Sequence, residues 1–399
     1  MSFEKWKNYN WGEIATLEYG KALTGYKENK KGKGYPVFGT NGPIGFYDKY
    51  LSDKPGVIIG RKGAYRGVHY SESPFFVIDT AYYLNPTIPE LDLKWAYYNL
   101  KLTDINRLDS GSAIPSTSRS DFYSLEVKLP PLFIQQKIAS ILSALDDKIE
   151  LNNRMNKVLE QMAQAIFKQW FVDFEFPNEN GEPYKSSGGE MEWCEELGKE
   201  IPKGWRIGTI GEIVKIVRGA SPRPIQEYLS DKGMPWLKIS DATASASKYV
   251  INTNEFIKEE GISKSRIVTP GTLILSNSAT PGIPKIMLIE ACVHDGWLIF
   301  DNYNGITKEL LYYFLLHNRE EILSLSNGSV FRNLKTDILK NYKIIIPNDV
   351  VIKKSTSFFE NANEVIKNRM LENESLMSLR DTLLPKLMSG EIDVSEIEL

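Results

Sequence analysis

The chain has few cysteines and no long apolar run. Its 399 residues include two cysteines, Cys194 and Cys292, too few for a disulfide framework or a cysteine-based metal site. We therefore expect a cytoplasmic protein with reduced thiols. The N-terminal MSFEKWKNYN has no apolar core like that of a signal peptide, and no run approaches 18 apolar residues. We expect neither secretion nor contact with a membrane.

The sequence also lacks the usual motifs of enzymes. It has no GxxxxGK[ST] loop for nucleotide phosphates, no GxGxxG after a strand and no HExxH. Asn85, Pro86 and Thr87 do not form the Asn/Asp-Pro-Pro-aromatic loop of DNA adenine methyltransferases. The three histidines have no partner spacing that fits a metal site or a nucleophilic triad; they are His69, His294 and His317. These absences predict a chain that binds rather than catalyses, with no cofactor and no metal of its own.

The formal net charge is −3, which at first argues against a polyanionic partner. The charge is nevertheless segregated along the chain. Residues 1–130 and residues 205–347 each carry 17 Lys/Arg and 14 Asp/Glu, whereas residues 177–204 carry 3 and 7, and residues 348–399 carry 6 and 10. Two mildly basic blocks thus alternate with acidic segments, an asymmetry that the total conceals.

The two basic blocks are halves of a tandem repeat. WGEIATLEYG (Trp11–Gly20) matches IGEIVKIVRG (Ile210–Gly219) at an offset of 199, and PGVIIG (Pro55–Gly60) matches PGTLIL (Pro270–Leu275) at 215. GSAIPSTSRSDFYSLEVKLP (Gly111–Pro130) corresponds to GSVFRNLKTDILKNYKIIIP (Gly328–Pro347) at 217, the offset that also holds afterwards. Each half therefore consists of a variable block followed by a part of fixed length.

The variable blocks and the fixed parts predict different structures. Short apolar runs such as GVII, FFVI, TLIL and YKIII, bounded by Gly, Pro, Asn and Asp, predict β-rich blocks with a few helices. Residues 134–174 contain no Pro or Gly and predict an amphipathic helix of about forty residues. A second long helix is expected from Val351 to Met388, with Pro385 bending or ending its last turns.

The first long helix carries an apolar stripe that favours pairing with the second helix. The stripe comprises Ile138, Ile141, Leu145, Met155, Leu159, Met162 and Ile166. Asn152 falls on the same stripe, where a polar residue either fixes the register of a coiled coil or lies at its rim. Antiparallel pairing would separate the two blocks by roughly 60 Å, at about 1.5 Å per residue. The expected fold class is α+β: two β-rich blocks in tandem repeat, with two long antiparallel helices forming a coiled coil, a pseudo-twofold dumbbell.

Both blocks carry side chains suited to duplex DNA. Lys and Arg neutralise phosphates, while Arg, Asn and Gln can read base edges. Between Leu17 and Tyr70 there are 10 Lys/Arg against 4 Asp/Glu. The candidates in the first block are Thr40, Asn41, Arg61, Lys62, Arg66, Ser116, Ser118 and Arg119. Those in the second block are Arg218, Ser221, Arg223, Lys238, Ser276, Asn277, Lys285, Arg332, Asn333 and Lys335. A lysine-rich loop is also typical of an ordinary solvated surface, so the signal is that such segments recur at matching repeat positions.

Several strings resemble the specificity subunits of type I restriction–modification enzymes. YPVFGTNGPIGFYDKYL, PGVIIGRKG and DTAYYL look like one type of target-recognition domain, and residues 129–174 look like the first spacer helix of that family. RGASPRP and LRDTLLPKLMSGEI are similar to other family segments, whereas residues 360–375 match its second helix loosely. The resemblance covers essentially the whole chain.

The resemblance implies a function and a division of the chain. Each target-recognition domain would read one half of a split site in double-stranded DNA, and the helices would set the gap and dock two methyltransferase subunits. Restriction (motor-nuclease) subunits would join in the full complex, and S-adenosylmethionine, ATP and Mg²⁺ would belong to those partners. The expected segments are residues 1–130 (first recognition domain), 131–176 (first spacer helix), 177–204 (acidic linker), 205–347 (second recognition domain) and 348–399 (second spacer helix and tail). The alternatives are a coiled-coil scaffold whose blocks bind peptides, and an unrecognised nuclease.

Overall fold

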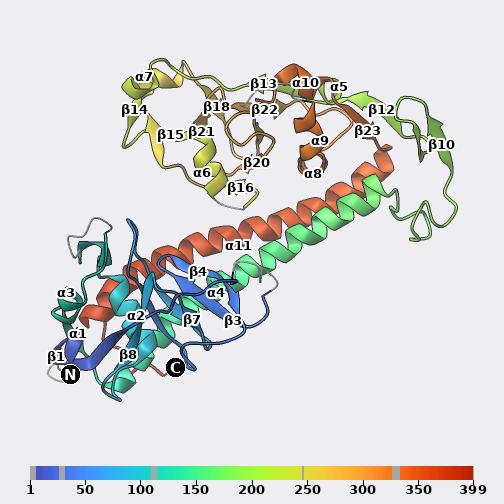
Figure 1. Ribbon diagram of the computed structural model, residues 1–399. Coiled ribbons are helices and arrows are strands. Elements are labelled where there is room, and N and C mark those ends of the chain that lie inside the picture. Colours follow the sequence, from blue (N-terminus) through green and yellow to red (C-terminus); the bar gives the residue numbers. More distant parts are fainter. Residues whose placement is uncertain (1–5, 27–31, 109–114, 245–246, 326–332, 399) are drawn as a thin grey trace. The chain divides into compact units, whose positions relative to one another are not determined.

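The computed structural model describes residues 6–26, 32–108, 115–244, 247–325 and 333–398. The chain divides into two compact units. The first unit comprises Met1–Asn152 and Leu371–Leu399, and the second comprises Asn153–Met370. Each unit therefore combines one β-rich block with one segment of each long helix (Figure 1).

The described part of the first block is built on three sheets, with strand orders β1-β9, β2-β8-β5-β6 and β4-β3-β7. Its strands are β1 (Lys7–Asn10), β2 (Ala15–Tyr19), β3 (Tyr35–Gly39), β4 (Gly42–Tyr47), β5 (Gly56–Gly60), β6 (Val68–Ser71), β7 (Phe76–Val77), β8 (Ala81–Pro86) and β9 (Glu126–Leu129). Its short helices are α1 (Trp11–Ile14), α2 (Leu93–Lys101), η2 (Ile105–Arg107) and α3 (Arg119–Tyr123). Trp11, Trp95 and Phe122 are fully buried and lie in its core.

The second unit contains two five-stranded sheets, with orders β13-β22-β19-β20-β16 and β14-β17-β15-β21-β18, and the pairs β10-β11 and β12-β23. Its strands are β10 (Met191–Cys194), β11 (Lys199–Pro202), β12 (Arg206–Thr209), β13 (Lys215–Arg218), β14 (Leu229–Ser230), β15 (Met234–Leu237), β16 (Tyr249–Val250), β17 (Glu255–Ile257), β18 (Arg266–Val268), β19 (Leu273–Ser276), β20 (Pro284–Met287), β21 (Ala291–Val293), β22 (Trp297–Asp301) and β23 (Lys343–Ile346). Its short helices are α5 (Ile210–Ile213), η4 (Ile225–Glu227), α6 (Ile239–Ala244), α7 (Glu259–Ile262), α8 (Lys308–His317), α9 (Arg319–Ser324) and α10 (Thr336–Lys340).

The repeated Gly-Glu-Ile string forms the same local structure in both units. Asn10 caps α1 and Thr209 caps α5, and each is in a capping box with the glutamate three residues later. The glycine lies in close packing in both units. A Cβ at Gly12 would lie 2.8 Å from the Cβ of Tyr123, which is too close, and one at Gly211 would lie 3.1 Å from the Cβ of Lys340, a tight contact. The sequence match at an offset of 199 therefore reflects one structural motif used twice.

Strand pairing corrects one repeat offset. Gly60 pairs with Ala81, and Ser276 pairs with Trp297, so β5 and β19 correspond at an offset of 216 rather than 215. The Pro-Gly dipeptides mislead the alignment because β5 begins directly at Gly56, whereas one residue, Thr272, separates Gly271 from the start of β19. The offset of 217 after the blocks is confirmed by the two long helices, which begin at Leu132 and Asp349.

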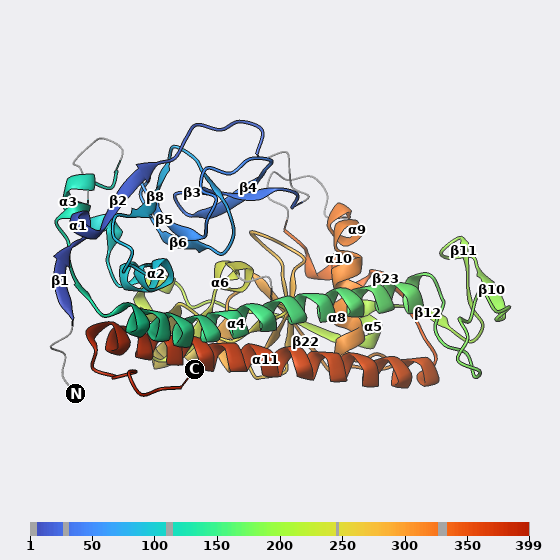
Figure 2. The same cartoon turned by 90° about the horizontal axis from the view of Figure 1, so that it is seen from below.

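The long helices α4 (Leu132–Phe167) and α11 (Asp349–Ser389) run antiparallel within each unit (Figure 1 and Figure 2). In the first unit, Ile138 and Leu142 of α4 share a buried core with Leu384 and Leu387 of α11. In the second unit, the corresponding buried side chains are Ala163 and Phe167 with Phe359 and Ile366. A π-helical turn, η3 (Lys168–Val172), ends α4. The predicted tandem repeat with two long antiparallel helices is confirmed.

Two members of the predicted apolar stripe were misplaced. Met155 and Met162 are 38% and 50% exposed, respectively. Asn152 and Ala163 are buried instead. We call the line of contact between α4 and α11 the seam. A helix turns by about 100° per residue, so a residue three positions after a seam residue, as Met155 is after Asn152, lies about 60° to the side of the seam. The two methionines therefore lie on the flank of the helical pair.

Asn152 lies in the seam rather than at its rim. Its side chain is fully buried, and its Nδ2 donates to Asn373 Oδ1 at 2.9 Å and to Glu372 Oε2 at 2.8 Å. These bonds form only in one alignment of the helices, which is how a buried amide specifies register.

The structure narrows one further expectation and changes another. Pro385 lies inside α11, which continues to Ser389, so the proline does not end the helix. The acidic segment 177–204 is folded: β10 and β11 form a hairpin, and Cys194 and Ile201 pack with Phe174, Phe176 and Trp205. In the described residues, no helix is long and apolar enough to cross a membrane.

Candidate nucleic-acid interface

In both units one strand end closely approaches the loop before a neighbouring strand. β2 ends at Tyr19 and β13 ends at Arg218, each followed by a glycine. A Cβ at Gly20 would lie 2.0 Å from the carbonyl oxygen of Ile78, and one at Gly219 would lie 2.1 Å from that of His294. Only glycine fits, because the backbones touch. This contact brings the strand end beside Asp79 in one unit and Asp295 in the other.

In the first unit, two arginines converge on one tyrosine. The guanidinium carbon of Arg61 lies 4.8 Å from the centre of the Tyr19 ring, and that of Arg119 lies 5.0 Å from it. Arg61 Nη1 donates to the backbone carbonyl of Asp79 at 2.9 Å, which fixes its direction. Tyr19 is 48% exposed, so this group is open to solvent. We call Tyr19, Arg61, Lys62, Asp79 and Arg119 the first arginine cluster.

Arg119 is held by the helix that it begins. Its Nη2 donates to the hydroxyl of Tyr123 at 2.9 Å, and that hydroxyl also accepts the backbone NH of Leu17 at 3.0 Å. The hydrogen bond from Arg119 lowers the pKa of the Tyr19 phenol, against the opposing effect of burial. The side chain is therefore preorganised while its charge faces an exposed aromatic ring, as suits phosphate binding.

The segment at residues 115–118 pairs with the loop that carries Arg61 and Lys62. Lys62 and Ser116 form an isolated antiparallel bridge, and the NH of Thr117 donates to the carbonyl of Arg61 at 2.8 Å. Lys62 Nζ lies 3.8 Å from Asp79 Oδ2, with both side chains about half exposed. The structure thus brings together Arg61, Lys62, Ser116 and Arg119, four residues that the sequence analysis proposed.

In the second unit, Asp295 organises the cations. Arg218 Nε donates to its backbone carbonyl at 2.7 Å, and Arg223 Nη2 lies 3.3 Å from its Oδ2. Ser221 Oγ donates to Oδ1 at 2.9 Å. Burial would raise the pKa of Asp295, but the Ser221 bond and the two arginines hold it below its ordinary value. Arg218 and Arg223 remain 59% and 79% exposed, so their charges face solvent. We call Arg218, Ser221, Arg223 and Asp295 the second arginine cluster.

Backbone hydrogen bonds show that the two clusters occupy equivalent places. Arg61 NH donates to Thr80 and its carbonyl accepts from Thr117; Asn277 NH donates to Gly296 and its carbonyl accepts from Leu334. Asp79 and Asp295 precede the acceptor residues, at the same offset of 216. The equivalent loops place Asp79 and Asp295 alike, but different elements carry the cations. Arg61 and Lys62 follow β5 and Arg119 begins α3, whereas Arg218 ends β13 and Arg223 follows it.

Other predicted residues have structural partners or lie elsewhere. Arg66 is 4% exposed and donates to backbone carbonyls of Gly63 and Asn106; Ser276, Asn277 and Lys285 are also buried. Burial lowers the pKa of Lys285 to about 8. Lys238 forms an ion pair with Glu255, and Ser118 caps α3. Thr40 is half-buried, while Asn41, Asn333 and Lys335 are exposed. Arg332 lies outside the described residues.

Three residues that organise the clusters are not among the candidates predicted from the sequence: Asp79, Asp295 and Tyr19. The predicted candidates are cations, amides and aliphatic hydroxyls, the groups expected to contact DNA directly. The sequence does contain a sign of the two aspartates: Asp79 in DTAYYL and Asp295 in DGWLIF are separated by 216 residues, the offset that also relates β5 to β19. An aspartate in a basic patch is recognisable as an arginine partner only when the loop is folded.

The described residues contain no group of three or more His, Cys, Asp or Glu side chains that could hold a metal ion. His69 and His294 are partly buried, and burial lowers the pKa of both imidazoles. Burial also raises the pKa of the Cys292 thiol, which keeps it protonated and unreactive. The two imidazoles and the thiol therefore belong to the packed interior.

Comparison with known proteins decides the family. A sequence profile described as "Type I restriction modification DNA specificity domain" matches residues 3–161 and 202–372. The chain belongs to this family of type I restriction–modification specificity subunits. Specificity subunits supply DNA recognition and are not themselves catalytic, so this chain is not an enzyme on its own.

Relatives of this specificity subunit cover both repeats. The type I restriction enzyme MjaIX specificity subunit of Methanocaldococcus jannaschii is 28% identical over 314 residues, which are 76% of this chain and 70% of that protein. The HindI specificity subunit of Haemophilus influenzae is 25% identical over 336 residues, 70% and 71% of the two chains. The crystal structure of the S subunit from M. genitalium superposes with a TM-score of 0.63 over 96% of each chain, at 21% identity. That structural likeness shows a shared fold.

Proposed function

We propose that each β-rich block of this specificity subunit reads one half of a split site in double-stranded DNA. The observation that carries the proposal is the equivalence of the two arginine clusters. Each cluster combines cations with a hydrogen-bonding loop, a chemistry that fits both phosphates and base edges. A chain that reads two half-sites needs one reading surface in each repeat.

The roles of the candidate residues differ with their exposure. Arg61, Lys62, Arg119, Arg218 and Arg223 are the cations that would contact DNA. Asn41, Ser116, Ser221, Asn333 and Lys335 are exposed or partly exposed polar residues that would add hydrogen bonds. The buried residues Arg66, Ser276, Asn277 and Lys285 would support the loops, and Thr40, Ser118 and Lys238 would act mainly through their local bonds.

The helices would set the gap and dock two methyltransferase subunits. Two copies of one partner require two equivalent surfaces. Met162 of α4 and Leu379 of α11 stand at the repeat offset of 217 and are 50% and 47% exposed. Large apolar side chains open to solvent at equivalent places fit a partner that binds twice. S-adenosylmethionine, ATP and Mg²⁺ would be held by the methyltransferase and restriction subunits, and the complex would act in the cytoplasm.

The proposal is tested with the complex of this chain and its methyltransferase subunits. Its dissociation constant is measured at moderate salt for a cognate duplex and for a random duplex of equal length. We expect tighter binding of the cognate duplex by about a thousandfold or more. Equal affinity for both duplexes would refute DNA specificity and favour a protein-binding scaffold. Cleavage of DNA by the isolated chain with Mg²⁺, abolished by changing one of its carboxylates, would instead favour a nuclease.

A further inference from the structure

Each block is tied to α4 and α11 of its own unit through a buried tyrosine hydroxyl. In the first unit, the hydroxyl of Tyr98 in α2 donates to Asp146 Oδ2 of α4 at 2.7 Å. Arg380 Nη1 of α11 donates to the other oxygen, Oδ1, at 2.7 Å. One carboxylate therefore joins the block to both helices. We call these three residues the first clamp.

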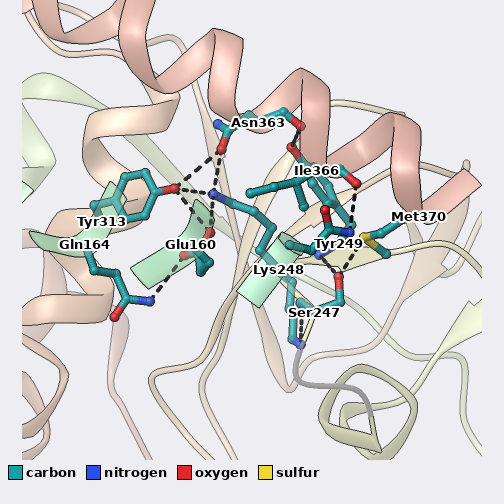
Figure 3. A network of polar contacts seen from close by, with 11 residues as sticks. Glu160, Gln164, Ser247, Lys248, Tyr249, Tyr313, Asn363, Ile366 and Met370 are labelled. Atoms are coloured by element: carbon teal, nitrogen blue, oxygen red, sulfur yellow. Dashed lines mark hydrogen bonds and ion pairs between the residues drawn. The ribbon is translucent and has the colours of Figure 1, made fainter. Parts of the chain in front are cut away.

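In the second unit, a lysine lies at the centre of the corresponding contact (Figure 3). Lys248 Nζ is 2.6 Å from the hydroxyl of Tyr313 in α8, 2.7 Å from Asn363 Oδ1 of α11 and 3.1 Å from Glu160 Oε2 of α4. The Tyr313 hydroxyl also donates to Glu160 Oε2 at 3.2 Å. We call Glu160, Lys248, Tyr313 and Asn363 the second clamp.

The clamps are equivalent, but the cation has changed its place. Tyr98 and Tyr313 each end a Tyr-Tyr pair in matching helices, and both hydroxyls are directed at the fifteenth residue of a long helix, Asp146 or Asn363. The counterpart of Arg380, at the offset of 217, is Ala163, which carries no charge. In the second unit the positive charge comes from the block itself, through Lys248. The negative charge is also at a different place: Asn363 of α11 stands at the position equivalent to Asp146, and the carboxylate comes from Glu160 of α4.

Lys248 is deeply buried, so its stability depends on the charged partner that the helices supply. Its side chain is 2% exposed, and its ammonium lies 4.3 Å from the ring centres of both Tyr312 and Tyr313. Burial lowers its pKa, and the neighbouring Glu160 carboxylate opposes that shift. A buried charge that loses its partner is strongly destabilising. Lys248 therefore requires the helix segment that carries Glu160. At the corresponding place in the first unit it would meet the like charge of Arg380, whose ion pair with Asp146 already engages the carboxylate there.

We propose that the clamps are positioning devices that key each block to its own segments of α4 and α11, with Lys248 as the positioning residue of the second block. The orientation of a reading surface on its support decides which base edges its side chains reach. The clamps thereby contribute to recognition without touching DNA. The expected effect on half-site discrimination rests on the proposed function. The expected effect on the distance between block and helices does not.

The test uses the complex with methyltransferase subunits and two variants, Lys248→Met and the charge-neutral pair Glu160→Gln/Lys248→Met. The neutral pair leaves no unpaired charge, so it keeps the test valid if the single variant fails to fold. Duplexes altered in one half-site at a time give the discrimination of each block. We expect both variants to lose about tenfold of the discrimination at the second half-site, comparable to one bidentate base contact, and to keep that at the first. Lys264→Met, at an exposed lysine that contacts the Tyr228 hydroxyl, is the matched control.

The first clamp gives the reciprocal experiment, and spin labels give a readout independent of DNA. Tyr98→Phe is expected to weaken discrimination at the first half-site alone. Labels on Asp231→Cys and Asn361→Cys, both exposed in the second unit, are expected to show a broader distance distribution in the neutral pair. Unchanged discrimination and an unchanged distribution in the folded neutral pair would overturn the proposal. If the wild-type complex discriminates at neither half-site, the DNA function fails while the distance measurement still decides on the clamp.

Discussion

The first arginine cluster predicts how binding depends on salt. Arg61 and Arg119 both lie within 5.0 Å of the centre of the Tyr19 ring, so we expect each to neutralise a phosphate of the bound duplex. Each neutralised phosphate adds about 0.9 to the slope of log affinity against log salt. The variant Arg61→Met/Arg119→Met should lower that slope by about 1.8. Between 50 and 200 mM salt, this reduces the salt-induced loss of affinity by about twelvefold.

The assay is fluorescence anisotropy of a labelled cognate duplex titrated with the complex at several salt concentrations. Lys101→Met/Arg107→Met is the control, because it removes two exposed charges from the same block, outside the cluster. A slope unchanged from wild type, or a decrease of equal size in the control, would show that the cluster does not contact phosphates.

Three further predictions concern the scaffold of the reading surfaces. Because burial lowers the pKa of Lys285 to about 8 from 10.5, the unfolded chain holds more protons between these values. The stability of the wild type relative to Lys285→Met should therefore rise as pH increases from 8 to 10.5, measured by urea unfolding; a flat difference would contradict the assigned burial. Gly20→Ala should cost about 3 kcal/mol or more, since its Cβ would lie 2.0 Å from a backbone carbonyl oxygen, whereas Gly39→Ala meets only ordinary contacts and should change stability little in the same unfolding assay. Asn152→Leu/Asn373→Leu should raise the free energy of unfolding by about 1 kcal/mol, because it replaces a buried amide pair with apolar side chains. A lower thermal midpoint than that of the wild type would show that the amide pair does not reduce stability.

Much of the architecture was predictable because the repeat and the helices leave strong patterns. The absence of Pro and Gly over residues 134–174 and the constant offset of 217 predicted the long helices. The details of the seam were less predictable. Met155 and Met162 match the apolar spacing as well as Leu159 does, and only the pairing of two particular helix faces decides which side chains are buried.

The candidate site was predictable as a region but not as an arrangement. The sequence drew attention to Arg61, Lys62 and Arg119, and the structure brings them together around Tyr19. The predicted candidates also included Arg66. Its guanidinium instead donates hydrogen bonds to backbone carbonyls of its own loop and of Asn106, so it is not free to contact DNA. Whether an arginine faces solvent depends on loop geometry, which has no period or spacing in the sequence.

The central claim is that the two blocks read two separate half-sites, and sequencing of methylated adenines tests it most directly. A host carrying the complete modification complex is compared with hosts carrying Arg61→Met/Arg119→Met or Arg218→Met/Arg223→Met. The account predicts a split methylated site in the wild type, with the first variant relaxed in one half only and the second variant relaxed in the other half only. A continuous site, or the same half relaxed by both variants, would contradict it.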